Sequence, residues 1–255
     1  YLNSSKSSVK GTVSAKDLLE TACQSGFLRG CYFEATQILE EGNKADVLKA
    51  QRMLKDTCDK GDGLSCVAHA SILLEAQDPK HNEQIKEIFE QTCSKGIGAG
   101  CSKLAGLYEQ GRIFEVNLDR ATVLYDRACS LGHLSSCIDL AQLYSAGKKE
   151  GYSNEHSLHL LETACSGGAW SGCLQLAEKY RNGVGVEPSL NKAKDILKRS
   201  CGAGFLKACV QLGGYWEQQK DSVGKNTIAI EHYEQACVGN EMSGCHRLAV
   251  IYNHS

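Results

Sequence analysis

The sequence predicts an all-α fold, an α/α superhelical solenoid of stacked helix pairs with one disulfide in each repeat. The 14 cysteines form seven pairs whose members lie eight positions apart, and successive pairs follow every 35 or 36 residues. A fixed period of this size indicates a repeat protein, in which each unit buries its apolar face only by stacking on its neighbours. The pairs are Cys23/Cys31, Cys58/Cys66, Cys93/Cys101, Cys129/Cys137, Cys165/Cys173, Cys201/Cys209 and Cys237/Cys245.

The chain must reverse direction inside each cysteine pair. On one continuous helix the two cysteines would lie about 12 Å apart, which exceeds the roughly 4.4–6.8 Å between Cα atoms that a disulfide allows. The third residue after the first cysteine is Gly or Asn, the two residues that most readily take the left-handed conformation ending a helix. We therefore expect a helix to end near each first cysteine and another to begin near each second one. The expected turn residues are Gly26, Gly61, Gly96, Gly132, Gly168, Gly204 and Asn240.

The residues around the cysteines favour helices that cross closely. Only Ala, Gly, Ser or Thr precedes a cysteine, and a large apolar residue lies four positions before each first cysteine, on the same helix face. These apolar residues are Leu19, Leu54, Phe89, Tyr125, Leu161, Leu197 and Tyr233.

The chain divides into a polar N-terminal segment or cap, residues 1–13, and a single repeat domain, residues 14–255. The domain opens with a helix over residues 14–23, which is the second half of a repeat. Six segments between successive cysteine pairs follow. Each segment holds one helix that starts from the second cysteine of a pair and another that ends at the first cysteine of the next pair. The domain thus comprises about six full repeats with a half-repeat at each end.

Composition limits the partners and the compartment. A formal net charge of −2 argues against nucleic acid as a partner, and no run of about 18 apolar residues predicts a membrane span. Regular cysteine pairs indicate disulfides, which require an oxidising compartment and a thiol-disulfide oxidoreductase during folding. Structural zinc is the competing interpretation, but it needs four ligands in one place, whereas these pairs are spread along a rod.

The repeats also resemble a known family. The pattern CxxLAxLYxxG, followed by GVGVxxxxxKAxxxLxxxC and a trailing glycine, is similar to the Sel-1-like repeat, a relative of the tetratricopeptide repeat. The cysteines eight apart in every unit resemble those of the Helicobacter cysteine-rich protein family within it. The resemblance covers residues 15–252 and implies a secreted or periplasmic superhelix with disulfides between neighbouring helices. Some family members are described as penicillin-binding proteins or weak β-lactamases.

We weighed that activity against the residues. A serine β-lactamase needs a Ser with a Lys one helical turn later, and Ser189 and Lys192 offer this spacing. No KTG or SDN motif accompanies them, and Ser189 is better interpreted as the N-cap of the following helix. His156 and His159 lie three apart on a predicted helix without an evident third metal ligand. We therefore predict no cofactor, no metal and no catalytic residue beyond this weak Ser189 and Lys192 pair.

The remaining functional surface is the concave groove that stacked helix pairs create. Its mixed polar side chains suit a protein or an extended peptide, such as a peptidoglycan stem peptide or a host protein, with Arg181 and Lys207 available for a carboxylate. An ordinary solvated surface is the competing interpretation for each of them. The groove residues are Ser135, Gln142, Ser171, Glu178, Arg181, Asn182, Lys207, Glu217 and Gln218.

These observations favour a secreted or periplasmic monomer that binds proteins or peptides. One alternative is a β-lactamase-like or penicillin-binding hydrolase, as described for the family that the chain resembles. A second alternative is an assembly factor of the mitochondrial intermembrane space, another oxidising compartment.

Overall fold

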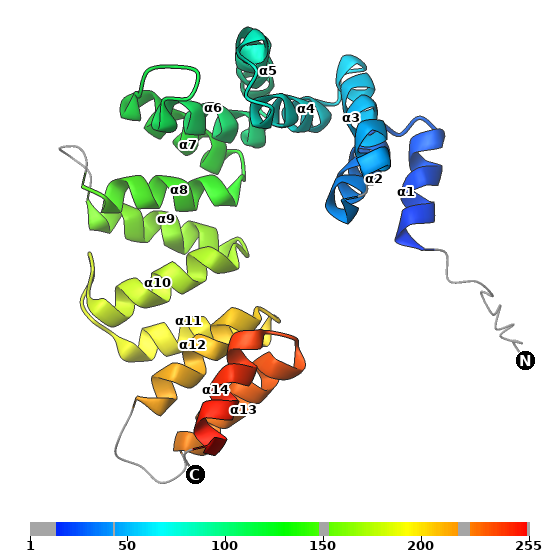
Figure 1. The fold of residues 1–255 in the computed structure, drawn as a ribbon. Helices are drawn as coiled ribbons and strands as arrows, with labels where there is room; N and C mark the ends of the chain where they lie inside the picture. Colours follow the sequence, from blue (N-terminus) through cyan, green and yellow to red (C-terminus); the bar gives the residue numbers. More distant parts are fainter. Residues whose placement is uncertain (1–13, 43, 148–152, 219–224, 254–255) are drawn as a thin grey trace, which may run out of the picture. The chain divides into compact units, whose positions relative to one another are not determined.

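The computed structural model of the chain describes residues 14–42, 44–147, 153–218 and 225–253. The predicted N-terminal segment, residues 1–13, lies outside the described residues. Within the described ranges the protein is all-α, with fourteen α-helices, one short 3₁₀ helix and no strand (Figure 1). The predicted fold class is therefore confirmed.

The α-helices alternate between two types that differ in the cysteine they carry. A first-type helix carries the second cysteine of a pair near its N-terminus, and a second-type helix carries the first cysteine near its C-terminus. The first-type helices are α2 (Leu28–Glu41), α4 (Gly63–Glu75), α6 (Gly98–Gln110), α8 (Leu134–Ser145), α10 (Trp170–Asn182), α12 (Leu206–Glu217) and α14 (Met242–Asn253). The second-type helices are α1 (Ala15–Gln24), α3 (Lys44–Asp59), α5 (Asn82–Ser94, preceded by the 3₁₀ helix η1, Pro79–His81), α7 (Leu118–Ser130), α9 (Asn154–Ser166), α11 (Leu190–Gly202) and α13 (Lys225–Val238).

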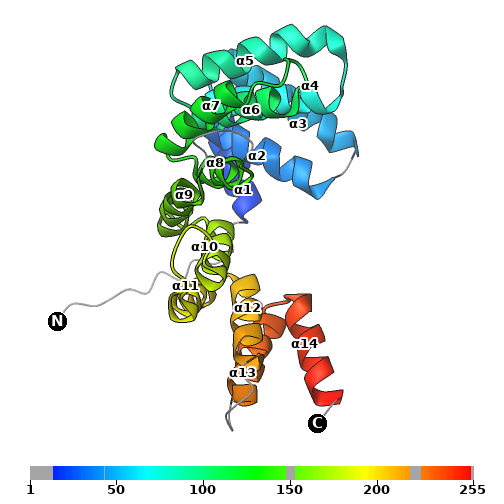
Figure 2. The ribbon, with the colours of Figure 1, turned by 90° about the vertical axis from the view of Figure 1, so that its left-hand side faces the viewer.

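The helices form two compact units, unit 1 from Tyr1 to Leu131 and unit 2 from Gly132 to Ser255. Unit 1 contains α1 to α7, and unit 2 contains α8 to α14. Within each unit every helix packs against the next one in chain order (Figure 1). Figure 2 shows this arrangement in unit 2, where α12 lies beside α13. This nearest-neighbour stacking is what the period of the sequence predicts.

The turns inside the cysteine pairs end the second-type helices as predicted. All seven expected turn residues have positive φ, from 69° at Asn240 to 100° at Gly61. At Gly168, its N–H donates to the Cys165 carbonyl at 3.1 Å, and the Ala169 N–H donates to the Ala164 carbonyl at 2.9 Å. This pair of bonds is a Schellman motif, which satisfies carbonyls at the helix end. The same pair of bonds occurs at Gly26, Gly61, Gly96, Gly204 and Asn240.

The first-type helices begin near the second cysteine of each pair, as predicted. Each one starts three residues before that cysteine, as α10 does at Trp170. The turn between the helices is very short. Only Gly168 and Ala169 lie between Gly167, the C-cap of α9, and the first residue of α10. The second cysteine therefore lies one turn inside its helix, where its side chain faces the end of the preceding helix. The same offset of three residues holds for Cys31, Cys66, Cys101, Cys137, Cys173, Cys209 and Cys245.

The cysteines link the two helices around each of these turns, and the predicted pairing is the one observed. In six pairs the disulfide holds Cα atoms that lie 4.4 to 4.8 Å apart. Cys129 and Cys137 are disulfide-bonded as well, and no cysteine in the described part of the chain is free. One disulfide per repeat is thus a property of the fold. The six pairs are Cys23–Cys31, Cys58–Cys66, Cys93–Cys101, Cys165–Cys173, Cys201–Cys209 and Cys237–Cys245.

Small residues allow these helices to cross closely, as the sequence predicts. A Cβ atom added to Gly172 on α10 would lie 3.0 Å from the Cβ of Ala164 on α9. The large apolar residues four positions before the first cysteines then fill the core, and Leu54, Phe89 and Leu161 are fully buried. Leu19 is only partly buried, because the terminal helix α1 packs against a single neighbour.

Candidate functional site

Four helices of unit 2, three of the first type and one of the second, border a hollow. It has a volume of about 220 Å³ and lies among α10, α12, α13 and α14. Two arginines and one glutamate border it together with two tyrosines, so it is polar and carries a positive balance of charge. Its lining residues are Glu178, Arg181, Val210, Gln211, Gly214, Tyr215, Gln218, Tyr233 and Arg247.

Arg181 is held in place at this hollow by an aromatic ring. Its guanidinium carbon lies 5.3 Å from the ring centre of Tyr215, within the range of a cation–π contact. Its Nε donates to the side-chain oxygen of Asn182 at 3.1 Å. Arg181 forms no ion pair with any carboxylate among the described residues. Its charge is therefore available to an incoming anion.

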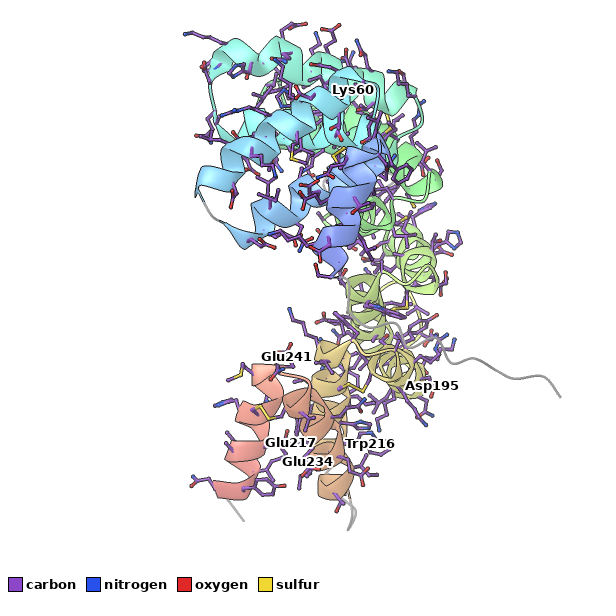
Figure 3. The ribbon with its side chains drawn as sticks, turned by 90° about the vertical axis from the view of Figure 1, so that its right-hand side faces the viewer. Lys60, Asp195, Trp216, Glu217, Glu234 and Glu241 are labelled. Atoms are coloured by element: carbon purple, nitrogen blue, oxygen red, sulfur yellow. A yellow bond between two sulfur atoms is a disulfide. The ribbon has the colours of Figure 1, made fainter. Side chains whose placement is uncertain are left out.

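Both tyrosines of the hollow are neutral hydroxyl groups. Burial raises the pKa of Tyr215, with the charge of Arg181 acting in the opposite direction. Burial also raises the pKa of Tyr233, as does its hydrogen bond to Glu217. The Tyr233 hydroxyl donates to Oε2 of Glu217 at 2.7 Å, so this carboxylate joins α12 to α13. Glu217 is labelled in Figure 3.

Three of the nine predicted groove residues line the hollow, namely Glu178, Arg181 and Gln218. Asn182 adjoins it through its bond to Arg181, and Glu217 is engaged with the next helix. The other four are exposed on α8, α10 and α12 but do not line it. These four are Ser135, Gln142, Ser171 and Lys207.

Sequence reasoning missed Gln211, Tyr215 and Arg247. Gln211 and Arg247 each lie two positions after their cysteine, and no predicted groove residue occupies that position. It lies on the same helix face as the fifth and ninth positions, which predicted groove residues such as Glu178 and Gln218 occupy. Tyr215 occupies the sixth position, where Leu107 lies in an equivalent helix. A buried aromatic hydroxyl at a leucine position is a signal that comparison of the repeats could have found.

The structure does not assemble Ser189 and Lys192 into a nucleophilic pair. The Ser189 hydroxyl accepts a hydrogen bond from the Lys192 backbone N–H at 3.3 Å. Ser189 is therefore the N-cap of α11, as the sequence predicts. The Lys192 ammonium lies 5.1 Å from the ring centre of Tyr180 instead. His156 bonds to the Ser153 hydroxyl at 2.7 Å. In the described part of the chain no cluster of three metal-ligating side chains occurs.

A larger hollow of about 830 Å³ lies among α9, α10 and α11, also in unit 2. Its apolar lining includes Trp170, Leu176 and Tyr180, and its charged lining includes Lys192 and Arg199. The sequence does not predict this hollow, because the pattern of the second-type helices indicates only packing positions.

The fold and the groove define a helical-repeat scaffold that presents a polar hollow. Sequence comparison then identifies the repeat. The Sel1 repeat matches residues 98–133, 134–168, 170–205 and 206–237, more than half of the chain, and the protein belongs to the Sel1 repeat family. A comparison with curated proteins found no match.

Solved structures of other Sel1 proteins share this fold. A Sel1 repeat protein from Oxalobacter formigenes is 17% identical, with a TM-score of 0.69 over 91% of this chain and 98% of its own. The protective antigen c5321 of uropathogenic Escherichia coli is 21% identical, with a TM-score of 0.65 over 93% of this chain. The present chain spans only 51% of c5321.

Among the described helices none is both long and apolar enough to cross a membrane. The disulfides point to an oxidising, extracytoplasmic environment. Sel1 repeats generally serve as protein-interaction modules, and the fold seen here is of that kind.

Proposed function

We propose that this protein is a secreted or periplasmic module that binds an extended peptide or protein segment through the hollow around Arg181. The observation that carries the proposal is the guanidinium of Arg181, which has no ion-pair partner among the described residues and is fixed over Tyr215 beside the second arginine, Arg247. A planar guanidinium binds a carboxylate through two parallel hydrogen bonds, which an ammonium cannot do.

The size and charge of the hollow define the ligand more closely. About 220 Å³ holds one or two side chains or a chain end, and not a whole small molecule of drug size. Two arginines face one carboxylate, Glu178, so an anion is favoured near Arg181 while Glu178 can accept a peptide N–H. A peptide that ends in a free carboxylate, such as a peptidoglycan stem peptide, meets both requirements, as does such a segment of a host protein.

An array of random peptides with free C-terminal carboxylates, matched with the same peptides amidated at the C-terminus, tests the proposal on the oxidised protein. We expect binding to a subset of the free-carboxylate peptides. Arg181→Ala should weaken the best of them about 10- to 100-fold, the range for losing a charged hydrogen-bond partner. Lys207→Ala is the matched control, since Lys207 is exposed on α12 outside the hollow.

Equal binding of free and amidated peptides would contradict the role of the carboxylate. Undiminished binding by both Arg181→Ala and Glu178→Ala would show that the peptide binds at another place, and the larger hollow at Trp170 would be the next candidate.

The hydrolase alternative gains no support from Ser189, whose hydroxyl caps a helix. Location in the mitochondrial intermembrane space would be detected by cell fractionation.

A further inference from the structure

Three polar side chains from three helices of unit 2 meet in one hydrogen-bonded cluster. The Lys179 ammonium on α10 donates to the Ser145 hydroxyl at the end of α8, over 2.9 Å. The Ser145 and Ser157 hydroxyls lie 2.8 Å apart, with Ser157 on α9. Lys179 also donates to the side-chain oxygen of Asn154 at 3.2 Å. Ser145 therefore lies between a lysine and a second serine, and it is the exposed member of the three.

The repeats themselves show that the fold does not require this cluster. Lys179 is the sixth residue after its cysteine, where α6 and α8 carry the buried Leu107 and Leu143. Ser157 lies eight before its cysteine, where four other second-type helices carry a fully buried alanine and α5 carries the buried Ile85. The alanines are Ala50, Ala121, Ala193 and Ala229.

Two apolar positions have thus become polar in adjacent helices, and the two new side chains both contact Ser145. Burying a hydroxyl and part of an ammonium lowers stability relative to leucine and alanine. Local departures from the rules of a fold occur mainly where function requires them. The cluster is separate from the hollow around Arg181, so it is independent of the proposed peptide binding.

Lys179 is partly buried and has no charged partner among its hydrogen bonds. Burial lowers the pKa of this lysine. Its hydrogen-bond partners, Ser145 and Asn154, are uncharged, and no carboxylate in the described part of the chain forms an ion pair with it. In its deprotonated form, a lysine within hydrogen-bond distance of a serine hydroxyl can accept the hydroxyl proton.

We propose that Ser145 is a nucleophile that accepts acyl groups from carboxylic esters, with Lys179 as its base and Ser157 as a positioning residue. The Ser145 oxygen bonds to the ester carbonyl carbon while its proton passes to the Lys179 nitrogen. The bond from that carbon to the alcohol oxygen then breaks, and the alcohol leaves with the proton from Lys179. Water hydrolyses the acyl-serine in the second half-reaction and releases the carboxylic acid.

A fluorophosphonate probe tests the nucleophile on the intact, oxidised chain. The serine oxygen bonds to phosphorus, fluoride leaves, and peptide mass spectrometry locates the adduct. We expect the adduct on Ser145, none in Ser145→Ala, and a labelling rate at least about 100-fold lower in Lys179→Leu, the scale of general-base catalysis. Release of p-nitrophenol from p-nitrophenyl acetate should fall in the same variants.

The variants are matched to the fold. Lys179→Leu and Ser157→Ala introduce residues that other repeats carry at the same positions, so both should retain or raise the thermal midpoint. Ser157→Ala should slow labelling several-fold, a change that a purely structural role would not produce without lower stability. Ser189→Ala is the serine control and should leave labelling within twofold. Labelling at other serines, or an unchanged rate in Lys179→Leu, would overturn the proposal.

Discussion

Removing one central disulfide should destabilise unit 2 by an amount that the structure specifies. The bond between Cys165 and Cys173 closes a loop with a sequence separation of 8. On the chain-entropy model, such a short loop contributes about 2.5 kcal/mol. Cys173 is also fully buried, so Cys165→Ala with Cys173→Ala leaves a small void that costs about 1 kcal/mol more. We expect a total loss of roughly 3–4 kcal/mol.

The terminal pair, Cys237 and Cys245, provides the matched control. Its loop has the same sequence separation of 8, so the entropic contribution is the same. Both of these cysteines are partly exposed, and α14 packs at the end of the stack. In a solenoid, loss of an end unit removes one interface and loss of a central unit removes two. Replacing Cys237 and Cys245 by Ala should therefore loosen only α13 and α14.

Urea unfolding without reductant, followed by far-ultraviolet circular dichroism, measures the two losses. The central double variant should unfold at a urea concentration lower by about 1.5–2 M, given a typical slope of roughly 2 kcal/mol per molar for a domain of this size. Hydrogen exchange should show faster exchange from α8 to α12 in the central variant and from α13 and α14 alone in the terminal one. Equal shifts with identical exchange patterns would refute the nearest-neighbour reasoning.

Three further predictions concern single side chains. Tyr233→Phe removes the bond to Glu217 and should cost about 1.5–3 kcal/mol in urea unfolding, and an unchanged midpoint would contradict that contribution. Burial lowers the pKa of His69 and His232 in the folded protein. As the pH falls, these histidines are therefore protonated in the unfolded chain before they are protonated in the folded one, and the free energy of unfolding should decrease below about pH 6.5. His232→Gln should flatten this decline, and a parallel pH profile would refute it. Ser189→Ala should cost about 1 kcal/mol through loss of the α11 cap, with a lower thermal midpoint as the readout.

The turns and disulfides could be predicted because they depend on local covalent and backbone constraints. A separation of eight positions, a residue able to adopt positive φ and small neighbours leave few alternatives for a pair such as Cys165 and Cys173. The start of α10 at Trp170 could be predicted only to within one turn of Cys173, because helix propensity around a two-residue turn does not mark an exact boundary. The hollow was only partly predicted, because Arg247 and Tyr233 reach it from helices more than 50 residues beyond Arg181 in the sequence.

The repeats supply the comparison that a single sequence otherwise lacks. The sixth residue after the second cysteine is leucine in α6 and α8, because there it fills the core between helices. It is Lys179 in α10 and Tyr215 in α12, and each of these residues contacts the group to which we assign chemistry, Ser145 and Arg181 respectively. The position is isoleucine in α4 and α14 and polar Gln37 in α2, so the two departures in unit 2 are distinguished by their contacts with Ser145 and Arg181 rather than by polarity alone. Most of the exposed residues first assigned to the groove do not line the hollow. In this protein a polar residue at a packing position that also contacts a group to which we assign chemistry is therefore a stronger indication of function than an exposed polar residue.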